Sequence, residues 1–186
     1  NIKKSKKELI TDLLVIALLQ LSALGWGVHT IYTQRPVAIV FWQGTFYTVP
    51  AVALNDQQFD LDLLNQYGQQ RPVIIYAEKP NEIIGLTAMK NIIDQHAIPP
   101  HHQTQLYRKL ESHYEDIRPL QVDINEIITV DAEMKTDLMA IVEKSNTQIT
   151  DYDYFPLRAK YNTIIMMFSH EGELKNHIMV PPSNTK

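Results

Sequence analysis

The sequence predicts an α+β protein in which one N-terminal transmembrane helix precedes a domain with a mostly antiparallel sheet of about five strands packed with helices. Three observations lead to this prediction. A long apolar run near the N-terminus follows a cluster of lysines. Short segments rich in β-branched and aromatic residues then recur between turn residues, which is typical of strands. Segments with apolar residues at helical spacing lie between those strands.

The apolar run covers residues 9–31, and Gln20 and Ser22 are its polar interruptions between Leu13 and Leu24. As an α-helix it would rise about 34 Å, enough to cross a hydrocarbon core about 30 Å thick. Polar groups inside a bilayer are costly unless they are paired with another helix. Asp12 and Gln20 are therefore the candidate intramembrane contacts with a partner, and snorkelling beside Lys7 is an equal alternative for Asp12.

Lysines precede this run, and no lysine follows it before the predicted domain. The positive-inside rule then places the N-terminus in the cytoplasm, while aromatic side chains suit the opposite interface. The predicted parts are a cytoplasmic segment at 1–8, a transmembrane helix at 9–32, a domain beyond the membrane at 33–182 and a flexible tail at 183–186. The predicted membrane-interface anchors are Lys3, Lys4, Lys6, Lys7, Trp26 and Tyr32.

The apolar run has two other interpretations, a buried helix and a cleaved signal. A buried helix of a soluble protein would also be apolar, and the polar residues Asp12, Gln20 and His29 favour that alternative. A cleaved secretory signal is disfavoured because residues 28–34 offer no small-residue cleavage site.

The first part of the domain predicts a hairpin, a helix and a third strand. Residues 37–42 and 45–49 form the hairpin, turning at Gln43-Gly44, where glycine supplies the positive φ of a two-residue turn. A weak helical pattern at residues 55–67 precedes a strand at 73–77.

The second part of the domain predicts three helices and two closing strands. The helices are expected at residues 81–96, 102–113 and 131–144, the last with Asp131 as N-cap and Met134, Leu138, Ile141 and Val142 as its buried stripe. The closing strands are expected at residues 158–168 and 173–180.

Two of the predicted strands do not alternate between apolar and polar residues. Residues 37–42 and 164–168 are apolar on both faces, so both faces need a cover. The helices and loops of the domain itself can supply that cover. Alternatively, one face or an edge docks another protein.

Charge excludes one class of partner. Residues 1–32 carry a net charge of +2 while the whole chain carries −4, so the remainder is acidic. Nucleic-acid binding needs a clustered positive field, and none follows Lys7. The chain has no cysteine, which removes disulfides, thiolate metal sites and a cysteine nucleophile.

No motif predicts catalysis, a cofactor, a metal or a small-molecule substrate. The histidines at positions 96, 101, 102 and 113 do not have metal-motif spacing, and no carboxylate accompanies them at such spacing. Asp151 and Asp153 lack the pattern of a calcium loop and are interpreted as solvent-facing turn residues before a strand. Phosphate loops and serine-hydrolase elbows are also missing from the sequence.

Two stretches of the sequence carry a family resemblance. Residues 12–32, followed by Arg35-Pro36-Val37 and Phe41, are similar to the last transmembrane helix and first strand of the TfpX/TfpZ family of type IV pilin accessory proteins. Tyr154-Phe155-Pro156-Leu157 and a closing hairpin with Gly172 resemble that family's tyrosine-x-proline-leucine segment and C-terminal strands.

The resemblance implies a bacterial inner-membrane protein with a periplasmic domain and with no enzymatic activity or cofactor. Such a protein assists the biogenesis of a major type IV pilin, as a dedicated chaperone or an assembly modulator. The expected partners are the major pilin, the membrane and inner-membrane pilus assembly proteins. Family members begin with further transmembrane helices, so this chain resembles the later part of the family.

Two functions from other classes remain open. A periplasmic ligand-binding or sensory module would also suit an α+β domain after one span, and it would need a pocket with convergent polar groups. A membrane-bound hydrolase would need a dense group of titratable side chains in one cleft.

Overall fold

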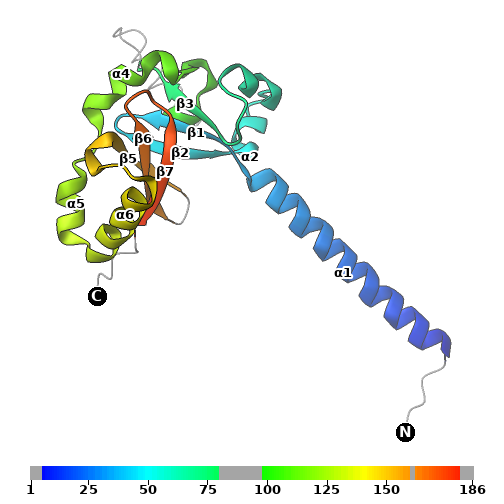
Figure 1. The fold of residues 1–186 in the computed structure, drawn as a ribbon. Helices are drawn as coiled ribbons and strands as arrows, with labels where there is room; N and C mark the ends of the chain where they lie inside the picture. The colour runs from blue at the N-terminus through cyan, green and yellow to red at the C-terminus, as the bar shows by residue number, and fades with distance from the viewer. Residues whose placement is uncertain (1–5, 80–97, 160–161, 181–186) are drawn as a thin grey trace. The chain divides into compact units, whose positions relative to one another are not determined.

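The computed structural model describes residues 6–79, 98–159 and 162–180, and the chain divides into two compact units, Asn1–Arg35 and Pro36–Lys186 (Figure 1). The predicted helix at 81–96, together with Lys3, Lys4 and the predicted tail, lies outside the described residues.

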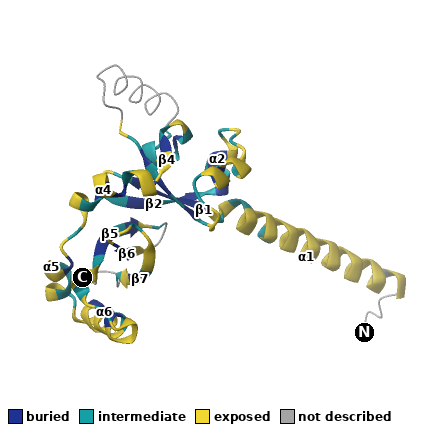
Figure 2. Cartoon of the chain, turned by 45° about the horizontal axis from the view of Figure 1, so that its top comes forward, coloured by how far each residue is buried: buried dark blue, intermediate teal, exposed yellow. Residues whose placement is uncertain are grey.

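The first unit contains a single long helix, α1 (Lys6–Gln34). Within it, Leu9–Gln34 is long and apolar enough to cross a membrane. Its side chains are exposed along almost the whole helix, which Figure 2 shows in yellow. None of its most apolar stretch is buried, whereas the core helix of a soluble protein would be mostly buried.

The second unit is built on a seven-stranded mixed sheet with the strand order β4-β3-β1-β2-β5-β6-β7. Two neighbouring pairs are parallel, β1 with β3 and β2 with β5, and the other pairs are antiparallel. The α+β class is therefore confirmed, whereas the predicted count of about five strands and the mostly antiparallel character need correction. The strands are β1 (Pro36–Trp42), β2 (Thr45–Pro50), β3 (Val73–Ala77), β4 (Tyr107–Lys109), β5 (Tyr152–Arg158), β6 (Thr163–Ser169) and β7 (Leu174–Val180).

Short helical segments connect and cover these strands. Among those that the structure describes, the two longest are α5 (Ile124–Val130) and α6 (Ala132–Ser145). The others are α2 (Ala51–Asn55), η1 (Leu61–Gln66), η2 (Pro100–His102), η3 (Thr104–Leu106), η4 (Glu111–His113), α4 (Tyr114–Ile117), η5 (Arg118–Leu120) and η6 (Ile149–Asp151).

The hairpin and the long helix of the domain form as predicted. Gln43 and Gly44 both have positive φ, 49° and 86°, as a two-residue hairpin turn requires. Asp131 caps α6, since its carboxylate accepts a hydrogen bond from the Met134 amide at 3.0 Å. Met134, Leu138 and Val142 form the buried side of α6.

Three element predictions are wrong. A continuous helix at 55–67 is replaced by α2 and η1, because the chain leaves the helix after Asn55 and restarts at the Asp60 cap. The predicted helix at 102–113 contains β4 with 3-10 turns on either side, since residues 107–109 complete the sheet beside β3. The single strand at 158–168 is instead the end of β5 and most of β6, a hairpin.

Both faces of the non-alternating strands are covered by elements of the domain itself. In β1, Ala38 and Val40 face one hydrophobic cluster, beneath α2 and η1, whereas Ile39 and Phe41 face another. In β6, Met166 and Phe168 join that second cluster, while Ile165 and Met167 face a third cluster under α5 and α6. In the part of the chain that the structure describes, both faces of these two strands are occupied by side chains of the domain itself, and docking of another protein at an edge stays a prediction.

Candidate functional site

The predicted intramembrane contacts both lie on α1. Gln20 is the central residue of this helix and is exposed, and Asp12 is exposed two turns nearer the N-terminus. The Gln20 carboxamide makes no hydrogen bond to any residue that the structure describes. A carboxamide can make up to four hydrogen bonds, so this side chain has the capacity to bind a partner.

The serine and threonine hydroxyl groups of α1 are satisfied within the helix. Thr11, Ser22, Thr30 and Thr33 each donate to the carbonyl oxygen four residues earlier, at 2.8–3.0 Å. Such back-bonding lets a hydroxyl enter an apolar medium without an unpaired donor. The hydroxyls of α1 are therefore compatible with hydrocarbon, in contrast to Gln20.

The predicted interface anchors occupy the two ends of α1. Lys6 and Lys7 lie exposed in its first turn, and Trp26 and Tyr32 are 74% and 63% exposed near its C-terminus. Arg35 lies just beyond the helix with its guanidinium 3.8 Å above the Tyr32 ring, and it donates to the Tyr32 carbonyl at 2.9 Å. A cation at this end also complements the helix dipole.

A buried cluster of titratable side chains in the domain was missed by the sequence prediction. Asp153 lies within β5 and is 1% exposed, so its interpretation as a solvent-facing turn residue is wrong. It shares a face of the strand with Phe155 and Leu157, and that alternation is the signal that could have placed it inside. Asp151, the other acid of the pair, is exposed at the end of η6.

Asp153 joins three segments that are distant in sequence. Its carboxylate accepts from the Tyr114 hydroxyl at 2.8 Å and pairs with Nε of Arg118 at 3.2 Å. Its other carboxylate oxygen lies 3.2 Å from Nδ1 of His170, a residue in the turn after β6. Burial, and next the hydrogen bond to Asp153, raises the pKa of Tyr114, so this hydroxyl remains a donor.

This cluster holds elements together, and among the described residues no serine or threonine hydroxyl is hydrogen-bonded to its histidine. The Nε2 atom of His170 faces the Thr150 carbonyl at 3.1 Å, so both ring nitrogens face hydrogen-bond acceptors. Within the described residues, the nearby Ser169 hydroxyl accepts from the Glu173 amide and makes no contact with the imidazole. A general base needs a free nitrogen near the proton that it abstracts.

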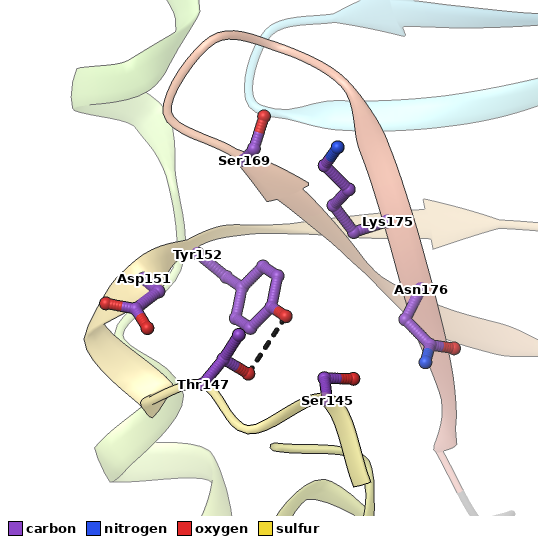
Figure 3. Close-up of a pocket in the computed structure, with 7 residues that line it drawn as sticks. All are labelled: Ser145, Thr147, Asp151, Tyr152, Ser169, Lys175 and Asn176. Atoms are coloured by element: carbon purple, nitrogen blue, oxygen red, sulfur yellow. Dashed lines mark hydrogen bonds between the residues drawn. The ribbon is translucent and has the colours of Figure 1, made fainter.

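A surface pocket of about 400 Å³ lies between the end of α6 and strand β7 (Figure 3). Figure 3 shows Tyr152 among the polar side chains, with its hydroxyl bonded to Thr147 at 3.0 Å. Lys175 is also paired with Glu173. The lining residues are all polar, namely Ser145, Thr147, Asp151, Tyr152, Ser169, Lys175 and Asn176.

Three of the four histidines considered from the sequence pack against other side chains, and the fourth, His96, lies outside the described residues. The His101 ring stacks on Tyr47 with 4.3 Å between centroids, and the His102 ring packs edge-on against the His101 ring. His113 stacks on Tyr76 at 4.6 Å and contacts Asp116 at 3.0 Å. Among the described residues, no three His, Asp or Glu side chains are grouped so that they could hold a metal ion.

Comparison of this chain with protein-family models, with curated proteins and with solved structures finds no match.

Proposed function

We propose that this chain is a non-enzymatic accessory protein of type IV pilus biogenesis, which assists the stability or assembly of a cognate major pilin. In this proposal α1 spans the bacterial inner membrane and the domain lies in the periplasm. The observation that carries the proposal is an exposed apolar helix, with lysines at its start, that leads through Arg35 alone into a folded α+β domain. The resemblance to pilin accessory proteins supplies the biological process.

The mechanism we propose uses both units of the chain. Pilins have a long apolar helix in the membrane and a globular head outside it, so a helper with a span and an outer domain can hold both parts. Gln20 supports the intramembrane half, because its depth leaves its carboxamide no route to the headgroups. Hydrogen bonds between helices in a bilayer contribute about 0.6–2 kcal/mol each.

Deletion of the protein, with pilin level and surface pili measured in parallel, tests the function. Normal pilin with few surface pili would indicate a role in assembly, and loss of pilin would indicate a chaperone. Unchanged pilin and unchanged pili would contradict the proposal.

The substitution Gln20→Leu tests the intramembrane contact. We expect about a 3- to 30-fold loss of co-purified pilin, because one interhelical hydrogen bond is removed from an otherwise apolar contact. Ser22→Leu is the matched control, since the Ser22 hydroxyl already donates to the Leu18 carbonyl within α1. Asp12→Asn extends the test to the cytoplasmic end of the helix. If Gln20→Leu and Asp12→Asn leave co-purification and pilus number unchanged, this half of the mechanism fails.

The pocket of Figure 3 favours a second candidate, a ligand-binding or sensory module. Its seven lining residues all carry polar side chains, which can contact a polar ligand. In a thermal-shift screen of sugars, amino acids and small carboxylates, a ligand of this pocket would raise the Tm of the native chain and not that of Asn176→Leu. Equal shifts in both proteins would place binding elsewhere.

A further inference from the structure

Strand β7 contains a β-bulge at Lys175. Met167 of β6 pairs with Asn176, and the next residue of β6, Phe168, pairs with Leu174. Lys175 is thus an extra residue that has no partner on β6. Successive residues of a regular strand point to opposite faces of the sheet, whereas a bulge re-aims a side chain. This is why Lys175 and Asn176, although consecutive, both line the pocket of Figure 3.

Several polar groups of this pocket have hydrogen-bonding capacity to spare. Within the described residues, the Ser145 hydroxyl and the amide nitrogen of the Asn176 side chain make no hydrogen bond. The Lys175 ammonium has three donors, and its ion pair is with Glu173 alone among those residues. One carboxylate oxygen of Asp151 accepts a backbone amide at 2.7 Å, and its other oxygen remains an acceptor.

The charges of the pocket favour an uncharged ligand. Lys175 and Asp151 are the charged residues of its lining, and their formal charges cancel. An anion would meet Asp151 and the partial negative charge at the C-terminal end of α6, while Lys175 is already paired. A cation would meet the Lys175 ammonium. The other lining residues carry hydroxyl or amide groups, which both donate and accept, namely Ser145, Thr147, Tyr152, Ser169 and Asn176.

We propose that this pocket binds an uncharged sugar. The hydroxyl groups of a sugar also both donate and accept, so they match the uncharged majority of the lining. The Tyr152 ring is the aromatic surface of the pocket, on which the C–H groups of a sugar ring can pack. A volume of about 400 Å³ suits a small ligand. This assignment names the ligand class of the second candidate function and rests on that candidate.

Sugars that share one ring and differ in charge test the assignment. The probes are glucose and galactose, which are uncharged, glucuronate, protonated glucosamine, and the zwitterion serine. Isothermal titration calorimetry of the full-length chain should use phospholipid nanodiscs, because glucoside and maltoside detergents carry sugar headgroups. We expect at least one uncharged sugar to bind about 2- to 5-fold more tightly than each charged probe, as the cost of one like-charge contact at a part-exposed site.

Substitutions in the lining locate the binding and test the charge balance. Ser145→Ala should weaken binding of the uncharged sugar by about 2- to 12-fold, the loss of one hydrogen bond. Lys175→Met leaves Asp151 as the charge of the lining and should shift the preference toward glucosamine, whereas Asp151→Asn should shift it toward glucuronate. His177→Ala is the control, because position 177 lies on the opposite face of β7 from the pocket and should bind like the native chain.

Three results would overturn the assignment. Equal or tighter binding of a charged probe by the native chain would overturn the sugar and leave the ligand-binding candidate standing. Binding of the uncharged sugar that Ser145→Ala and Lys175→Met both leave unchanged would place the sugar outside this pocket. No binding of any probe would overturn both the assignment and the second candidate. The proposed role in pilus biogenesis is independent of all three results, because deletion of the protein tests it.

Discussion

Gly172, in the turn between β6 and β7, occupies a position that a side chain cannot easily enter. Its φ of +86° is unfavourable for other residues, and a Cβ there would lie 2.8 Å from the Tyr114 ring. Tyr114 is 3% exposed and is tied to Asp153, so it cannot move away cheaply. We expect Gly172→Ala to lower the free energy of unfolding by about 2–4 kcal/mol, measured by urea unfolding of the full chain.

Gly44→Ala is the control for the ring contact. Gly44 has the same φ of +86°, but the nearest atom to its Cβ position is the Leu120 carbonyl oxygen at 3.8 Å. Only the backbone strain should remain, about 1 kcal/mol. Equal losses for the two variants would show that the contact with Tyr114 carries no cost.

Asp153 is the second residue for which we predict a large effect. Asp153→Asn keeps the size of the side chain but removes the charge that Arg118 and His170 face, so we expect a loss of about 2 kcal/mol. Asp116→Asn is a matched control, because Asp116 also contacts a histidine but its side chain is 65% exposed, and it should cost under about 0.5 kcal/mol. A similar loss in both variants, measured by urea unfolding, would contradict the stabilising role of the Asp153 cluster.

At the scale of elements, η2 makes the stability of the domain sensitive to pH. Burial, followed by the charge of His102, lowers the pKa of His101 to about 4, below the ordinary value of 6.5. Between these values the unfolded chain binds the proton first, so stability falls as pH falls. Because the ring is part-exposed, we expect this histidine to contribute a loss of only about 1 kcal/mol between pH 7 and pH 5.

His101→Phe isolates that contribution, since an aromatic ring keeps the stack on Tyr47 and cannot titrate. Urea unfolding at pH 7 and pH 5 should show a smaller loss for the variant than for the native chain. The same loss in both would assign the pH dependence to other groups.

Elements with a local signal were predicted from the sequence, and elements made by distant contacts were not. The Gln43-Gly44 turn and the Asp131 cap depend on neighbouring residues, so their sequence pattern is sufficient. β4 has three residues and exists because residues 107–109 pair with β3, which no local pattern of Tyr-Arg-Lys indicates. The inward position of Asp153 has a local signal in its alternation with Phe155 and Leu157, but its partners have none, because they come from α4, η5 and the turn after β6.

For the whole molecule, the sequence predicted the division between an apolar helix and a domain but not the order of strands. β3 adds parallel to β1, and β5 adds parallel to β2, each after a long connection. Those pairings are decided by which apolar faces meet once the chain has collapsed. A periodicity of two indicates a strand but does not indicate its neighbour.

Membrane topology is the prediction that belongs to the whole molecule. Transfer of Lys6, Lys7 and the preceding lysines across a bilayer is disfavoured, so we expect the N-terminus inside and the domain outside. The full-length variants Lys7→Cys and Asp137→Cys place one exposed thiol at the start of α1 and one on α6. A membrane-impermeant maleimide should label position 137 in intact spheroplasts, and position 7 only after lysis. The reverse pattern would invert the topology, and labelling of both positions in protein that alkaline carbonate extracts would show that α1 does not span the membrane.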